Sequence, residues 1–128
     1  MKNYTDIEQS KKLAEILPLE SADMWWPYYY DVVSDTGEYD KEPMLHKPIS
    51  DTEHTIPCWS LAALLNVLPS DIRRHEKTMF MTLEKAGAYN LYYKSKDRLD
   101  ELWETDFEPI DACYKIILDL QELQISSK

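Results

Sequence analysis

The sequence predicts an α+β fold in which a small antiparallel sheet has helices packed mainly on one face. Three observations support this class. Residues 57–68 are apolar almost throughout, residues 78–85 and 88–94 alternate as paired strands do, and residues 109–124 are amphipathic with a helical period. A chain of 128 residues suits one ordinary core. We therefore expect residues 1–128 to form a single domain.

Three helices are expected. Residues 5–17 form the first, because Thr5 and Glu8 have the spacing of a capping box and Pro18 stops the helix. Residues 57–68 carry so few polar side chains that they predict a central helix buried on every side. The last helix has one apolar face and one charged face, which predicts packing against the sheet.

The strands are expected on either side of the central helix. Residues 24–33 are rich in aromatic and β-branched side chains, and their proline favours an edge position. Ala86-Gly87 joins the two hairpin strands, and a further short strand is expected at residues 102–105. Residues 34–54 predict a long polar loop, which is either an insertion or a functional lid, and residues 70–77 a charged connector.

Charge and composition limit the partners and the location. Fourteen Lys and Arg against 24 Asp and Glu give a net charge of −10, which repels nucleic acid phosphates. An acidic protein can bind basic partners or imitate a nucleic acid, and its charge can also serve solubility alone. No apolar run could span a membrane, and no signal peptide is evident. We expect a soluble cytoplasmic protein with two reduced cysteines, Cys58 and Cys113.

Several kinds of chemistry lack the residues that they need. With only two glycines, the chain cannot build a phosphate-binding loop, and it has no zinc motif and no nucleophile elbow. His46 and His54 could hold a divalent metal in the acidic loop, but we interpret this segment as solvated. The acidic residues at 100–108 are likewise interpreted as a solvated face. No cofactor and no metal are predicted.

Cys58 is the one candidate nucleophile. It is expected in the first turn of the buried helix, where the helix dipole stabilises a thiolate. The pair Cys58-Trp59 resembles the Cys-Trp pair that opens the central helix of papain-like cysteine peptidases, and His75 and Asn90 follow in a compatible order. The resemblance implies a cysteine hydrolase. The alternative is that Cys58 is a small core residue.

An aromatic run provides a candidate binding surface. In a strand, Trp26, Tyr28 and Tyr30 would share one face, and Trp25 would lie on the other. Exposed on an edge strand, such residues could stack on sugars, bases or the prolines of a partner. The alternative is that they pack in the core.

Three segments together indicate an origin. QSKKLAEILPLESADMWW (residues 9–26), TIPCWSLAALLNVLP (55–69) and EPIDACYKIILDLQEL (108–123) resemble a group of short uncharacterised proteins from gut-bacterial genomes, often associated with prophages and other mobile elements. The resemblance implies class and origin. We expect a small non-enzymatic accessory protein that acts through protein–protein contacts. The alternatives are a cysteine hydrolase built on Cys58 and His75, or an acidic nucleic-acid mimic.

Overall fold

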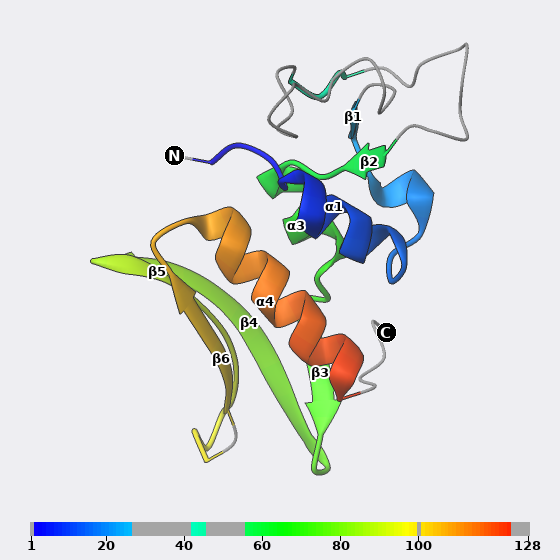
Figure 1. Ribbon diagram of the computed structural model, residues 1–128. Coiled ribbons are helices and arrows are strands. Elements are labelled where there is room, and N and C mark those ends of the chain that lie inside the picture. Colours follow the sequence, from blue (N-terminus) through cyan, green and yellow to red (C-terminus); the bar gives the residue numbers. More distant parts are fainter. Residues whose placement is uncertain (1, 27–41, 46–55, 100, 124–128) are drawn as a thin grey trace. The chain divides into compact units, whose positions relative to one another are not determined.

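The computed structural model describes residues 2–26, 42–45, 56–99 and 101–123 (Figure 1). The chain divides into two compact units, Tyr4–Ala63 and Met1–Asn3 with Leu64–Lys128. The described residues contain three α-helices and two antiparallel sheets, which confirms the predicted α+β class. That residues 1–128 form one domain stays a prediction. Apart from residues 42–45, the predicted loop at 34–54 lies outside the described residues.

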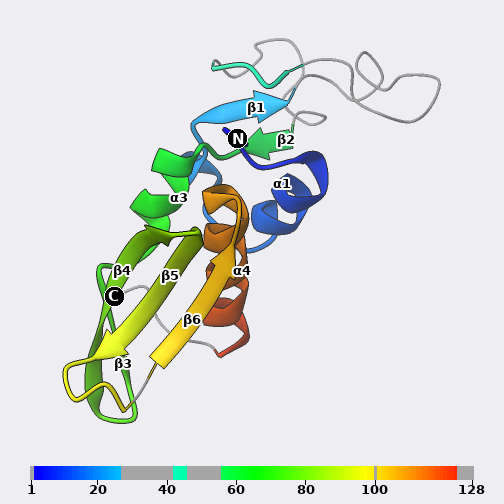
Figure 2. The ribbon, with the colours of Figure 1, turned by 90° about the vertical axis from the view of Figure 1, so that its left-hand side faces the viewer.

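The larger sheet belongs to the unit that begins at Leu64. Its strands are β3 (Asp71–Arg74), β4 (Lys77–Ala86), β5 (Ala88–Ser95) and β6 (Glu101–Asp106), and neighbours in the chain are neighbours in the sheet (Figures 1 and 2). The predicted hairpin is confirmed as β4 and β5, and the predicted strand at 102–105 as β6. Gly87 makes the hairpin turn at φ +78°, a conformation that favours glycine.

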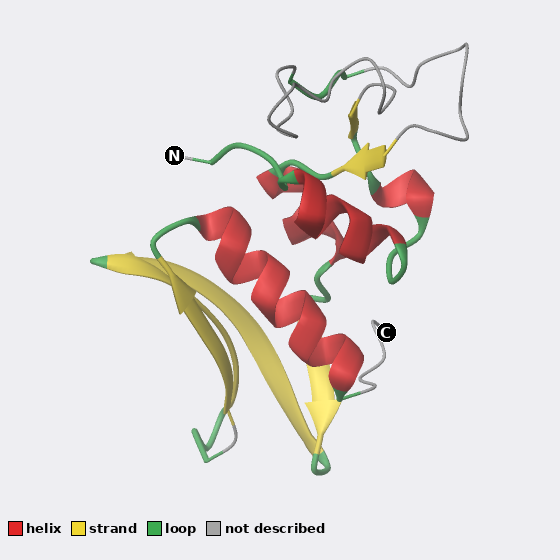
Figure 3. Ribbon diagram, in the orientation of Figure 1, coloured by secondary structure: helices red, strands yellow, loops and turns green. Residues whose placement is uncertain are grey.

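Alternating side chains give this sheet two different faces. On β4, Met79, Met81 and Leu83 are more buried than Phe80 and Thr82, as a strand with one covered face requires. Helix α4 (Pro109–Glu122) covers that face and packs against β5 and β6 (Figure 3). The core of the unit consists of buried side chains from both layers: Met79, Leu91, Tyr93, Ile110, Cys113, Ile116, Ile117 and Leu120.

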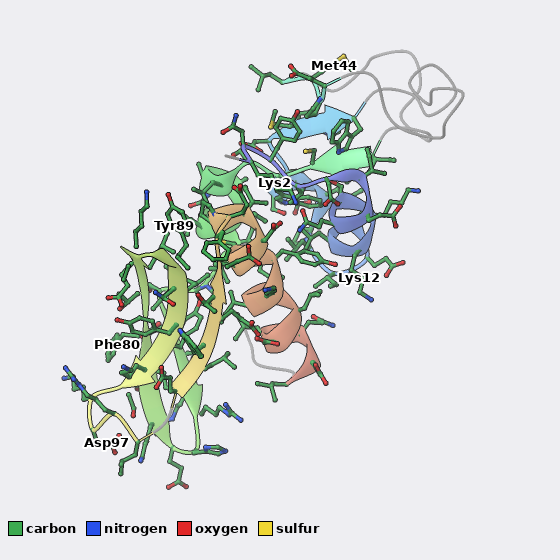
Figure 4. The ribbon with its side chains drawn as sticks, turned by 60° about the vertical axis from the view of Figure 1, so that its left-hand side comes forward. Lys2, Lys12, Met44, Phe80, Tyr89 and Asp97 are labelled. Atoms are coloured by element: carbon green, nitrogen blue, oxygen red, sulfur yellow. The ribbon has the colours of Figure 1, made fainter. Side chains whose placement is uncertain are left out.

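Helix α4 confirms the prediction of a C-terminal helix. Pro109 occupies its first turn, where a missing N–H costs nothing. Lys2 lies near this end of the helix: its Nζ is 2.7 Å from Asp111 Oδ1, and its backbone N–H donates to Glu108 Oε2 at 2.8 Å (Figure 4). None of the described helices has the length and apolar character that crossing a bilayer requires.

The predicted charged connector at residues 70–77 contains strand β3, which pairs with β4 from Asp71 to Arg74. Three of its four side chains are charged, so the strand shows no apolar alternation in the sequence. Only Ile72 is buried. The backbone pairing with β4 therefore makes this segment a strand, and its side chains contribute little to that choice.

The unit Tyr4–Ala63 contains α1 (Ile7–Ala14), the 3-10 turn η1 (Leu19–Ser21), and a two-stranded sheet of β1 (Met24–Trp26) and β2 (Ile56–Cys58). The capping box of α1 is formed by Asp6 and Gln9 and not by the predicted pair Thr5 and Glu8. The prediction was wrong by one residue because the Thr5 side chain is buried in the core.

The central helix α3 (Leu61–Val67) is shorter than the predicted helix at 57–68. Residues 56–58 are instead the strand β2, antiparallel to β1, with Pro57 opposite Trp25. Helix α3 starts after Ser60, whose hydroxyl accepts from the Ala63 N–H at 3.2 Å and donates to Asp23 at 2.5 Å. Its burial is one-sided: Ala63 and Leu64 are buried, whereas Ala62 and Asn66 are exposed.

Candidate functional site

Cys58 is a core residue at the end of β2, and its predicted position in the first turn of a helix was wrong. Its side chain is fully buried, with Sγ 3.4 Å from the Thr5 carbonyl oxygen and 3.6 Å from Thr5 Oγ1. Burial raises the pKa of the Cys58 thiol, and hydrogen bonds from Thr5 and Ser10 offset this only in part. The thiol is therefore protonated at neutral pH, which is the opposite of an activated nucleophile.

The two predicted partners of Cys58 both belong to the other unit, at different places in its sheet. His75 lies exposed in the β3–β4 turn with φ +53°, next to the Arg74–Lys77 pair. Asn90 pairs with Glu84 near the other end of β4. Lys77 and Glu84 are seven residues apart on β4, which at about 3.3 Å per residue is about 23 Å, so the structure does not bring His75 and Asn90 together.

The aromatic run is split between core and undescribed residues. Trp26 is buried: its Nε1 donates to Ser10 Oγ at 3.2 Å, and its ring meets Tyr4 edge-on at 5.6 Å. Its assignment to a binding surface was therefore wrong, because this side chain fills the core. Trp25 is half-buried, and its backbone pairs with Met44 in both directions. Tyr28 and Tyr30 lie outside the described residues.

The metal hypothesis falls on His46 and His54, which lie outside the described residues. Within the part of the chain that the structure describes, no group of three His, Cys, Asp or Glu side chains could hold a metal ion.

The strongest candidate site is a groove of about 750 Å³ between strand β6 and the last turn of α4. We call it the edge groove. Its lining combines carboxylates with apolar side chains, from β6 on one side and α4 on the other: Glu101, Leu102, Trp103, Glu104, Asp119, Glu122 and Leu123. Both elements belong to the same unit and pack against each other.

Strand β6 is the last strand of its sheet, so one side of its backbone faces no other strand among the described residues (Figure 2). Lys115 closes one end of this side: its Nζ donates to the Thr105 carbonyl at 3.2 Å and lies 2.9 Å from Asp106. The part of this edge that lines the groove runs from Glu101 to Glu104. An edge of this kind is a template for a further strand.

Three of the four carboxylates of the edge groove, those of Glu104, Asp119 and Glu122, interact with one another. Partial burial raises the pKa of Asp119 to about 7, and its hydrogen bond and repulsion with Glu104 and the charge of Glu122 add to the shift. Asp119 thus exchanges its proton near neutral pH, and a positive charge brought into the groove would favour the ionised form.

Asp119→Asn should make the protein more stable than wild type at pH 8 and leave it nearly unchanged at pH 4. The raised pKa means that protonated Asp119 stabilises the fold below its ordinary value of 3.8, and this contribution is lost as the pH rises through about 7. Because Asp119 is partly solvated, we expect at most about 1 kcal/mol. Urea unfolding at both pH values measures the difference.

Asp97→Asn supplies the control of opposite sign. Lys77, 2.8 Å away, and Ser95 hold the pKa of Asp97 well below its usual range, so removing its charge should lower stability at pH 8. Equal changes in the free energy of unfolding in both variants, or a loss of stability in Asp119→Asn at pH 8, would contradict the raised pKa of Asp119.

An aromatic face adjoins the edge groove. The sheet face turned away from α4 carries Phe80, Tyr92 and Trp103, with Tyr92 directly opposite Trp103 and Phe80 toward the end that also holds Asp97 (Figure 4). Trp103 is 53% exposed and Phe80 44%. Lys94 Nζ lies 4.9 Å from the centre of the Tyr92 ring. Trp103 belongs both to this face and to the lining of the groove.

The fold and the groove define an α+β protein in which, as far as the structure describes the chain, a sheet edge lies unpaired beside helix α4. No family model, no curated protein and no solved structure matches the chain.

The sequence did not predict this site, although one signal was present. Leu102 and Trp103 stand between two glutamates on a predicted strand, and Asp119 and Glu122 share a face of the last helix at i, i+3 spacing. The interpretation of residues 100–108 as a plain solvated face missed that Glu104 meets the helix carboxylate Asp119 across the groove.

Proposed function

We propose that this protein is a non-enzymatic accessory protein that acts through protein–protein contacts, and that the edge groove is its contact site. The observation that carries the proposal is the backbone edge of β6 at Glu101–Glu104, which pairs with no strand among the described residues and lies beside a groove that contains exposed apolar side chains. Trp103 is 53% exposed and Leu123 43%. An open strand edge supplies backbone hydrogen bonds, and apolar side chains beside it supply area to bury.

The alternatives have weaker support. A cysteine hydrolase needs a thiolate next to a base, whereas Cys58 is buried with a raised pKa, and His75 and Asn90 are far apart in their sheet. A nucleic-acid mimic needs regular rows of charge. On β6, Glu101 and Glu104 lie three residues apart and hence on opposite faces of the strand.

Site-specific photo-cross-linking tests the proposal. A photoreactive phenylalanine analogue is placed at Leu123 in the groove, or at Leu19, which is 58% exposed in the other unit. In lysate of the native host, we expect discrete adducts from position 123 and none of the same size from position 19. Trp103→Ser should weaken those adducts while leaving the circular dichroism spectrum unchanged. Identical adducts from both positions, or no adducts at all, would count against the edge groove as a contact site.

A further inference from the structure

We infer that the edge groove takes an extended protein segment rich in Lys and Arg, which pairs with β6 as a fifth strand of the sheet. This inference rests on the proposed function and names the chemistry of its partner. Two independent features lead to it: the open backbone of β6, and the charge of the groove beside it.

The backbone defines where such a segment would lie. Strand β6 pairs with β5 on one side over its whole length, and no strand of the described residues pairs with its other side, where an added strand would lie. Lys115 occupies the edge at Thr105 and Asp106. The segment therefore pairs along Glu101–Glu104, where the groove lies. Main-chain hydrogen bonds along an edge give affinity, and alternate side chains give specificity.

The charge of the lining selects a basic segment. Its charged residues are four carboxylates, Glu101, Glu104, Asp119 and Glu122, and no cation contributes to the lining among the described residues. Of the four, Glu101 is partly balanced by Lys94, whose Nζ lies 4.0 Å from its carboxylate. Side chains of an added strand alternate between the two sides of the sheet. On one side they meet Glu104 and Asp119. On the other side they lie beside the exposed ring of Trp103, where a Lys or Arg can stack.

The same charges disfavour a second copy of this chain at the edge. Pairing β6 with β6 would bring Glu101 and Glu104 of one copy close to those of the other, and like charges on paired strands are destabilising. The net charge of −10 also disfavours self-association, because two copies of the chain repel each other over longer range. Charged residues on an edge strand can serve only to prevent pairing with other chains. That role does not require an exposed aromatic side chain such as Trp103 beside the edge.

The probe is a fluorescently labelled peptide of about ten residues in which Lys and Arg alternate with Val and Thr, long enough to cover the open edge. Fluorescence anisotropy at low salt should show saturable binding. The same peptide with Glu in place of its Lys and Arg should not bind. A third peptide keeps the charges but carries N-methyl groups on alternate residues, which removes strand hydrogen bonds, and it should bind at least about tenfold more weakly.

A pair of matched variants separates the groove from the overall charge. Glu104→Gln with Glu122→Gln removes two charges from the groove, and Glu8→Gln with Glu20→Gln removes two from exposed positions in the other unit. We expect the groove variant to bind the basic peptide about fivefold to tenfold more weakly and the control to bind almost as wild type. Unchanged melting curves would show that both variants fold.

The inference is overturned if the Glu peptide or the N-methylated peptide binds as well as the basic peptide. It is also overturned if both double variants weaken binding equally, or if sedimentation shows a dimer that Trp103→Ser dissociates. Cross-linked adducts at position 123 without binding of the basic peptide would reject this partner chemistry and leave the proposed function standing. If neither adducts at position 123 nor binding of the basic peptide were found, both the proposed function and this inference would be rejected.

Discussion

Iodoacetamide should alkylate Cys58 in the native protein at least about a thousandfold more slowly than in the unfolded chain. The thiol is fully buried and its pKa is raised, so reaction requires the fold to open, and opening is rare in a protein of ordinary stability. Timed alkylation near neutral pH, followed by peptide mass spectrometry, measures the rate at each cysteine.

Two comparisons make the alkylation result decisive. Cys113 is also fully buried, and burial raises its pKa to about 12, so it should be protected to a similar degree. A Ser70→Cys variant places a thiol at an exposed position and should react at the rate of a free thiol. Rapid reaction of Cys58 while Cys113 stays protected would reveal an activated thiolate and revive the cysteine hydrolase hypothesis.

Thr5→Val should lower the free energy of unfolding by about 2–3 kcal/mol, because Thr5 is the centre of a buried hydrogen-bond network. Its Oγ1 lies 2.7 Å from Ser10 Oγ and accepts from the Trp59 N–H at 3.2 Å. Valine has nearly the same shape but leaves the Trp59 N–H and the Ser10 hydroxyl without this partner in a dry environment. Urea unfolding gives the free energy.

Thr5→Ser is the matched control, because it keeps the hydroxyl and removes only a methyl group. It should cost about 1 kcal/mol, the value of one buried methyl. If the valine and serine variants were equally stable, the hydrogen bonds of Thr5 would contribute nothing beyond packing, and the network would not hold this unit together.

The Thr5 network also gives hydrogen-bond partners to the buried polar groups around Cys58. Thr5 and Ser10 are fully buried, and Trp26 donates its indole N–H to Ser10. Each described hydroxyl of the cluster therefore has a partner within the core, as stable proteins require. The cluster joins the residues before α1 to the residue that follows β2, because the Thr5 N–H donates to the Trp59 carbonyl oxygen at 2.9 Å.

The charge of the edge groove depends on pH through Asp119. Because the pKa of Asp119 is about 7, the groove gains negative charge across the physiological range of pH. A bound cation would favour the ionised carboxylate further, since an opposite charge nearby stabilises it. In the binding that we propose, the groove would therefore become more complementary to the basic segment once that segment is bound.

The helices and strands whose segments have a clear hydrophobic periodicity were determined by the sequence alone. Alternation in β4 and β5 and the Ala86-Gly87 turn predict the hairpin, and the apolar face of residues 109–122 predicts α4. From these the α+β class follows. The neighbours that each element needs are close in the chain, so local patterns carry the information.

Pairings between distant residues were decided only by the tertiary structure. Residues 56–58 have the apolar character of a buried helix, but they form a strand because β1, far back in the chain, pairs with them. That pairing places Cys58 in the core. The edge groove likewise exists because α4 folds back against β6 and brings Asp119 close to Glu104. The hydrophobic periodicity of a single segment does not predict such a contact, because packing between elements determines it and propensity within an element does not.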